Sequence, residues 1–180
     1  MAARPRLSAP FLALLLAACW AGKPFYSKSD LKAPIAPGLY RTIETASPSE
    51  HGRYRISVRP DGYTALERAD SVEGELAGFA PLAGADGVFV AWFEQSSGRT
   101  LGGDEGTTYG LLERRGSEYL LSFPVCSETR ALAEAAGGLF KADPKMPICL
   151  FPDRASLEAG LRRVAAEGPL EKLRLVPAGD

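Results

Sequence analysis

The sequence predicts a mainly β fold of the α+β class: one antiparallel domain, barrel-like or a sandwich, with two helices near its C-terminal end. Two observations predict it. Between residues 38 and 125, short segments of alternating apolar and polar residues follow one another, separated by turn signals. After Cys126 the apolar residues recur at the helical period instead. The regular strand–helix alternation of parallel sheets is absent from the pattern. We therefore expect residues 38–180 to form a single domain.

The strand pattern is clearest in two predicted hairpins. Residues 53–59 alternate cleanly, and a Pro-Asp-Gly turn leads them into residues 63–68. Residues 109–114 and 118–125 form the second hairpin around a glycine. The other expected strands cover residues 39–46, 76–82, 88–93, 148–151 and 172–176. Many short strands at this spacing are typical of a sandwich or a barrel.

Two helices are expected after the first seven strands, near residues 128–140 and 154–167. Ser127 and Asp153 are the predicted N-caps, because their side-chain oxygens can accept from free backbone N–H groups. The apolar stripes that define the helices are Leu132, Ala136, Leu139 and Phe140 in the first, and Leu157, Leu161, Val164 and Ala165 in the second. Glu158 is expected on the outward face of the second helix.

Residues 1–18 have the plan of an export signal. Arg4 and Arg6 form a positive front, and residues 7–18 form an apolar run. As a helix this run would be roughly 18 Å long, against a hydrocarbon core of about 30 Å. The segment is too short to span a bilayer, so we interpret it as a targeting signal and exclude it from the fold.

The signal ends in Leu16-Ala17-Ala18-Cys19, which resembles the lipobox of bacterial lipoproteins. The resemblance implies that the chain is cut before Cys19, that this cysteine carries acyl chains such as palmitate, and that they hold the protein on a membrane. Trp20 is not the aspartate that commonly retains lipoproteins at the inner membrane. The resemblance therefore implies the outer membrane, facing the periplasm, in a two-membrane bacterium, and the cell membrane otherwise. An ordinary secretory signal, cut after Ala18 or Gly22, is the alternative.

Residues 19–37 contain three prolines, several serines and lysines, and no sustained periodicity, so they are predicted to be a flexible tether. Removal of residues 1–18 would leave 162 of the 180 residues, enough for one domain with a core. Loss of Arg4 and Arg6 takes the formal charge from −1 to about −3. This balance gives no sign of a nucleic-acid partner.

With Cys19 assigned to lipid, Cys126 and Cys149 remain as an even pair in an oxidising compartment, and we expect a disulfide between them. On the chain-entropy model it would stabilise the fold by roughly 3 kcal/mol. A metal pair or a catalytic thiol is the competing reading. The spacing matches no zinc pattern, and His51 is the only histidine in the chain. We expect neither a metal nor a cofactor.

No catalytic pattern stands out, and we expect a protein that is not an enzyme. His51 lies in a segment that reads as a loop, and no Gly-x-Ser-x-Gly elbow supplies a nucleophile. Residues 102–106 resemble the Gly-Gly-Asp-Glu-Phe signature of diguanylate cyclases without its phenylalanine, and we interpret them as a loop. A cell-wall or glycan hydrolase with paired carboxylates remains open, because sequence cannot set the separation of such a pair. Its candidates are Glu67, Asp70, Glu94 and Glu113.

Two features point to binding instead. Arg41, Arg53, Arg55 and Arg59 would form a basic stripe for an anionic partner if they share one sheet face, although we favour an ordinary solvated sheet face paired with glutamates from neighbouring strands. Aromatic residues on the strands either fill the core or line a cavity for an apolar or lipid ligand. They are Tyr54, Phe79, Phe89, Trp92, Phe93, Tyr109, Tyr119 and Phe123. The expected function is a noncatalytic binding or assembly role in the envelope, with a protein or lipid partner; ligand carriage is its alternative.

Overall fold

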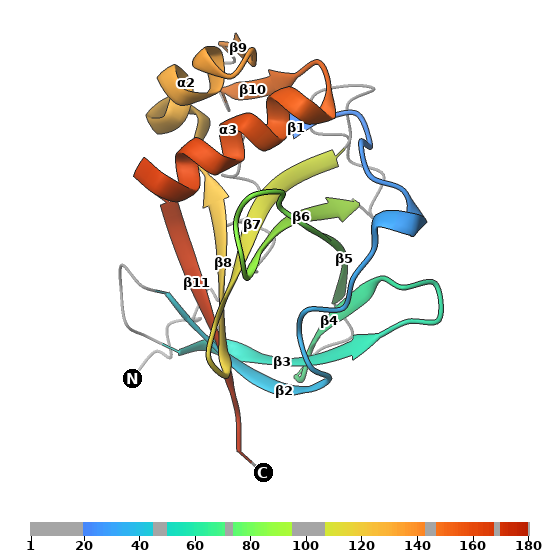
Figure 1. The fold of residues 1–180 in the computed structure, drawn as a ribbon. Coiled ribbons are helices and arrows are strands. Elements are labelled where there is room, and N and C mark those ends of the chain that lie inside the picture. The colour runs from blue at the N-terminus through green and yellow to red at the C-terminus, as the bar shows by residue number, and fades with distance from the viewer. Residues whose placement is uncertain are drawn as a thin grey trace, which may run out of the picture.

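The computed structural model describes residues 20–44, 50–70, 74–94, 107–142, 147–167 and 170–179. Eight antiparallel strands close into a barrel, and a layer of helices and short strands covers one end and one side of it (Figure 1). Around the barrel the strand order is β6-β5-β4-β3-β2-β11-β8-β7, and the pairing of β6 with β7 closes the ring. The predicted fold class is confirmed, with a barrel rather than a sandwich.

The nine predicted strands are all present. The barrel strands are β2 (Gly38–Glu44), β3 (Glu50–Val58), β4 (Thr64–Arg68), β5 (Gly74–Pro81), β6 (Val88–Glu94), β7 (Thr107–Arg115), β8 (Glu118–Pro124) and β11 (Leu170–Pro177). The covering layer contains β1 (Trp20–Gly22), β9 (Leu139–Lys141), β10 (Ile148–Phe151), the 3-10 helix η1 (Lys28–Asp30), α2 (Cys126–Ala135) and α3 (Arg154–Glu167). Both predicted hairpins form, β3–β4 and β7–β8, with Gly62 and Gly116 at positive φ in their turns.

The barrel interior is filled by the inward-facing residues of each strand. Large side chains such as Tyr54, Phe79 and Leu121 are at most 5% exposed there. Ile35, from the segment before β2, belongs to the same cluster, and the Tyr40 hydroxyl donates to the Ala36 carbonyl at 2.9 Å. The predicted aromatics Tyr54, Phe79, Phe93, Tyr119 and Phe123 belong to this cluster, and Phe89 packs against it.

A second core lies outside the barrel, on the outer face of β5, β6 and β7. Here Val90, Trp92 and Tyr109 pack against the N-terminal segment and the helices. The α3 stripe contributes Leu157, Leu161 and Val164, as predicted, whereas Ala165 is exposed. Asp153 caps this helix as predicted, since its Oδ1 accepts from the Ser156 N–H at 2.8 Å.

The first helix ends earlier than predicted. It runs over Cys126–Ala135 instead of 128–140, and Val125 rather than Ser127 is its N-cap. Gly137 adopts φ +88°, and the Gly138 N–H donates to the Ala133 carbonyl at 2.8 Å, which is how left-handed glycines end helices. The predicted helical residues Leu139 and Phe140 therefore lie in strand β9.

The predicted tether at residues 19–37 is also wrong for its described part. Trp20–Gly22 forms β1, which pairs parallel with β10 and antiparallel with β7. Tyr26 and Ile35 are 7% and 1% exposed, and the Lys32 N–H donates to the Phe79 carbonyl at 2.8 Å. The segment lacks periodicity because it runs along the barrel as irregular chain, and single apolar side chains hold it there. The folded domain thus includes Trp20.

Candidate functional site

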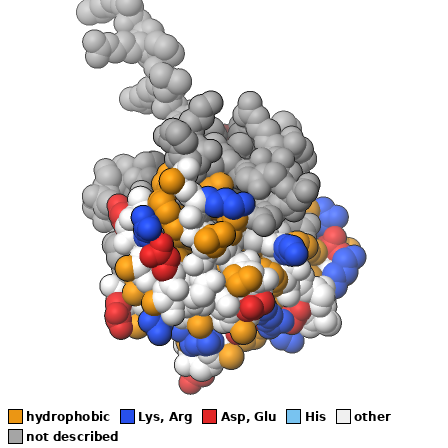
Figure 2. Space-filling model, turned by 90° about the horizontal axis from the view of Figure 1, so that it is seen from above, with side chains coloured by type: hydrophobic (Ala, Val, Ile, Leu, Met, Phe, Trp, Pro, Cys, Tyr) orange, Lys and Arg blue, Asp and Glu red, His pale blue; other side chains and the backbone are white. Residues whose placement is uncertain are grey.

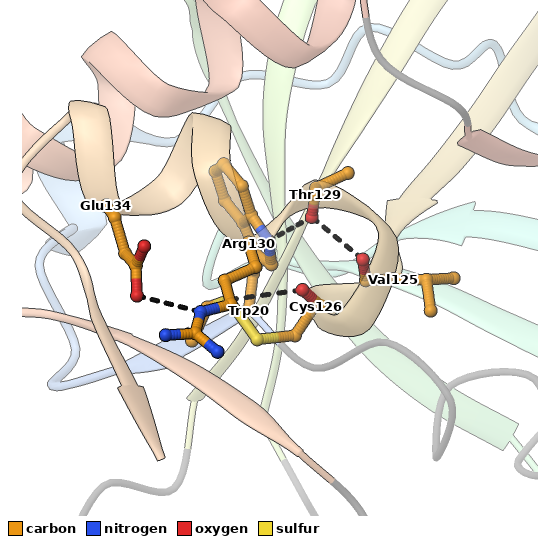
Figure 3. The surroundings of a disulfide bond; sticks show 7 residues. Trp20, Val125, Cys126, Thr129, Arg130 and Glu134 are labelled. Atoms are coloured by element: carbon orange, nitrogen blue, oxygen red, sulfur yellow. Dashed lines mark hydrogen bonds and ion pairs between the residues drawn. A yellow bond between two sulfur atoms is a disulfide. The ribbon is translucent and has the colours of Figure 1, made fainter. Parts of the chain in front are cut away.

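The predicted disulfide joins the start of α2 to β10 (Figure 3). The Cα atoms of Cys126 and Cys149 are 5.5 Å apart, and both residues are 0% exposed. The bond pins the covering layer at the point where the chain leaves β8. No solvent reaches either sulfur, so its role here is structural.

Trp20, the residue after Cys19, is buried beside this disulfide. Its side chain is 0% exposed, and Nε1 donates to Thr129 Oγ1 at 2.9 Å (Figure 3). Thr129 Oγ1 in turn donates to the Val125 carbonyl at 2.8 Å. The indole ring lies 4.7 Å from the Phe151 ring, centroid to centroid. On the remaining side a Cβ on Gly160 would be 2.9 Å from the indole, so glycine is needed there.

The register of β1 ties Trp20 to the disulfide. Trp20 pairs with Cys149, and Gly22 with Phe151. Above them Arg130 of α2 places its guanidinium carbon 4.3 Å from the Phe140 ring centroid and its Nε 2.9 Å from Glu134 Oε1. The first residue after the proposed lipidation site is therefore held by pairing, packing and a buried hydrogen bond. Cys19 itself lies outside the described residues.

A second contact network joins the N-terminal segment to α3. The Tyr26 hydroxyl donates to Glu158 Oε1 at 3.0 Å, and Arg154 Nε approaches the same oxygen at 2.7 Å. Arg154 also reaches Asp30 Oδ1 at 2.8 Å. Hydrogen bonds from the Ser27 backbone and from Arg154 lower the pKa of Asp30 to about 2, while burial and then Glu158 raise the pKa of Tyr26. The side chain of Glu158 is 13% exposed, so its predicted outward position is wrong.

The structure brings three of the four stripe arginines together on the outer face of the barrel. Arg41 and Arg53 sit directly opposite each other on β2 and β3, and Arg55 follows on the same face of β3. The register also places Glu67 of β4 directly opposite Arg55. Arg59 lies beyond the end of β3 and contacts Asp61 in the turn at 3.3 Å.

The described hydrolase candidates have different neighbours. Asp70 contacts Arg68 at 2.9 Å, and Glu113 contacts Arg115 at 2.9 Å. Glu67 is exposed on the outside of β4. The Glu94 side chain and residues 102–106 lie outside the described residues. His51, predicted in a loop, belongs to strand β3, and nothing further is described of its side chain.

Glu75 is the ionisable group that sequence reasoning missed. It precedes Ala77 and Phe79 on the face of β5 that points into the barrel, opposite Leu66 of β4. Its Oε2 is buried without a hydrogen-bond partner, as is Thr64 Oγ1 nearby on β4. Burial raises the pKa of Glu75 to about 7. The alternation of residues 75, 77 and 79 was a usable signal, but the predicted strand began at Leu76.

No family model, curated protein or solved structure matches this chain. Among the described residues no helix is long and apolar enough to cross a membrane. Within that same part of the chain, no group of three or more His, Cys, Asp or Glu side chains is arranged to hold a metal ion.

Proposed function

We propose that the protein is a lipoprotein of the bacterial envelope, acylated at Cys19, with a noncatalytic binding or assembly role. One observation carries the proposal: the fold includes Trp20, the residue directly after Cys19. A chain cut before Cys19 would keep every residue of the domain and none of the signal. The acyl chains would then stand next to a rigid part of the fold.

The burial of Trp20 argues against the alternative cut after Gly22. Such a cut would remove all of β1, open the space that the indole fills, and leave Thr129 without the N–H that now donates to it. Loss of a buried tryptophan side chain costs about 3–5 kcal/mol, a large part of the stability of a small domain. The buried disulfide also suits an exported protein. The burial of Trp20 therefore supports processing before Cys19, and the disulfide supports export.

A noncatalytic role is supported by where the polar groups lie. The described carboxylate candidates are on the outside of the barrel. Asp70 lies beside Arg68, and Glu113 lies beside Arg115. The core cluster inside the barrel consists of side chains at most 5% exposed, which argues against ligand carriage there. The outer face of β2 and β3, with Arg41, Arg53 and Arg55, is then the best-supported surface for an anionic partner.

The anchor is tested by the mass of the mature protein. We expect the intact mass and the N-terminal peptide to give a chain that begins at Cys19 and carries acyl chains. Incorporation of labelled palmitate should be lost in Cys19→Ser, and that variant should leave the membrane fraction. An unmodified Cys19, or a chain that begins at Lys23, would refute the proposal.

A further inference from the structure

We infer that the outer face of β2, β3 and β11 binds an acidic segment of another protein, with Arg41 at the centre of the contact. The inference rests on the proposed binding role and states which kind of partner the basic surface takes. The surface, called the arginine face below, combines three cations with three apolar side chains. They are Arg41, Arg53, Arg55, Leu39, Ile43 and Val176.

The strand register places Arg41 among apolar neighbours. Leu39 and Ile43 flank it along β2 on the same outer face, because alternate residues of a strand share a face. Across the strands, Arg41 pairs with Val176 of β11 on one side and with Arg53 of β3 on the other. Arg41 and its three apolar neighbours are all half-buried. The charge of Arg41 therefore lies within a mainly apolar patch.

Two cations of the arginine face have no carboxylate partner of their own. Within the described residues neither Arg41 nor Arg55 forms an ion pair, although the register places Glu67 opposite Arg55. In the covering layer, by contrast, Arg130 Nε lies 2.9 Å from Glu134 Oε1. Figure 2 looks onto that end of the molecule and shows basic and acidic side chains next to one another on its described part. The arginine face thus leaves positive charge for a partner to neutralise.

These features favour a protein over a lipid surface. Arginine is enriched at the centre of protein–protein contacts, where apolar neighbours exclude water and a carboxylate accepts its hydrogen bonds. An apolar face that binds a membrane enters it by roughly 5–10 Å, so its side chains must protrude. Leu39, Ile43 and Val176 are instead half-buried on the sheet. Arg41 and Arg53 are directly opposite each other, an unfavourable pairing of like charges that a bound carboxylate would offset.

The arginine face also lies away from the proposed anchor. Acyl chains on Cys19 would begin next to β1, which pairs with β7. Around the ring, β11 and β8 lie between β2 and β7, so β1 and the arginine face are on different sides of the barrel (Figure 1). A protein anchored beside β1 therefore keeps the arginine face accessible to a partner protein.

The experiment places the photoreactive residue benzoylphenylalanine at Val176, in cells that produce the full chain. Leu39 is a second position on the arginine face, and the exposed Arg163 of α3 is the control. We expect protease-sensitive adducts from both positions of the arginine face, at least fivefold more abundant than from Arg163, whose crosslinked partner peptides carry net negative charge. Arg41→Glu should abolish these adducts, and a lysine in place of the partner's acidic residue nearest the crosslink should restore them.

The outcomes separate this inference from the proposal beneath it. An adduct from Arg163 and from neither position of the arginine face would leave the binding role standing and overturn this surface. A partner peptide without net negative charge, or an adduct that persists in Arg41→Glu, would overturn the acidic partner. So would a lipid or glycan adduct that protease leaves intact, or an adduct with a second copy of the chain.

Two further outcomes concern the proposed function itself. No adduct at any of the three positions would overturn this inference and leave the binding role without support. An unmodified Cys19 in a chain that still gives the expected adducts would refute the anchor and support the acidic partner.

Discussion

At the scale of single residues, Glu75 places a titratable carboxyl inside the barrel. The wall around it is apolar, and its Oε2 finds no hydrogen-bond donor. Burial favours the neutral form and raises the pKa of Glu75 to about 7 in the folded protein, from about 4.5 in the unfolded chain. The folded state therefore holds this proton more tightly than the unfolded state does.

Stability should accordingly fall as the pH rises from about 4.5 to about 7, and then stay level. Asp30, whose pKa is lowered to about 2, acts in the opposite direction but below this window. We expect Glu75→Gln to flatten the slope and to make the protein more stable at pH 8, by up to about 3 kcal/mol, with little change at pH 4. Urea unfolding at several pH values measures the slope of stability against pH in both proteins. A slope that persists in the variant would show that another group causes it.

The burial of Trp20 could not be predicted from the sequence, whereas a helix cap and a turn could. Its burial depends on Gly160, Phe151 and Thr129, which lie more than 100 residues away and touch it only after folding. No local pattern encodes such a partnership. Asp153 and Gly62, in contrast, act on neighbours within three residues, so their cap and turn were predictable from the sequence.

At the scale of elements, the disulfide holds α2 and β10 together around β1. Its loop contains all of α2 and β9, so the bond restricts the unfolded chain as well as fixing the covering layer. We expect Cys126→Ala/Cys149→Ala to lower the free energy of unfolding by about 3 kcal/mol and to speed amide exchange in β1, measured by denaturant titration and hydrogen exchange. The barrel hairpin β3–β4 is the internal control. A loss of unfolding free energy below about 1 kcal/mol, or an equal increase of amide exchange in that hairpin, would contradict the role of the disulfide in holding the covering layer.

The elements also divide by how well the sequence predicted them. Strand β3 alternates because one face is inside the barrel and the other outside, and this pattern is visible within the strand itself. β1 and β9 have three residues each, too few to show a period, and they are strands only because β10 lies beside them. The two glycines at positions 137 and 138 are a local signal that ends the first helix before Leu139.

At the scale of the whole molecule, the barrel separates two surfaces. The helices and the N-terminal segment cover the outer face of β5 to β7, whereas the arginines lie on β2 and β3. Around the ring, β4 separates β3 from β5, and β11 and β8 separate β2 from β7 (Figure 1). A protein held on a membrane by its β1 end would therefore present the arginine face to its surroundings rather than to the covering layer. In a chain of net negative charge, this local basic surface would select an anionic partner.

We expect the double variant Arg41→Glu/Arg55→Glu to lose its partners in living cells without loss of the fold. Both side chains are on the outer face, where substitutions usually change stability by less than about 0.5 kcal/mol each.

The control is Lys28→Glu/Arg163→Glu, which makes the same change of charge at two exposed positions of η1 and α3. Crosslinking in cells that produce each variant, followed by mass spectrometry, should show the same species for the control and the unmodified protein, and at least a fivefold loss for the arginine variant. Equal losses in both would mean that net charge, and not this face, governs binding; unchanged crosslinks in both would show that the partner binds another surface of the barrel.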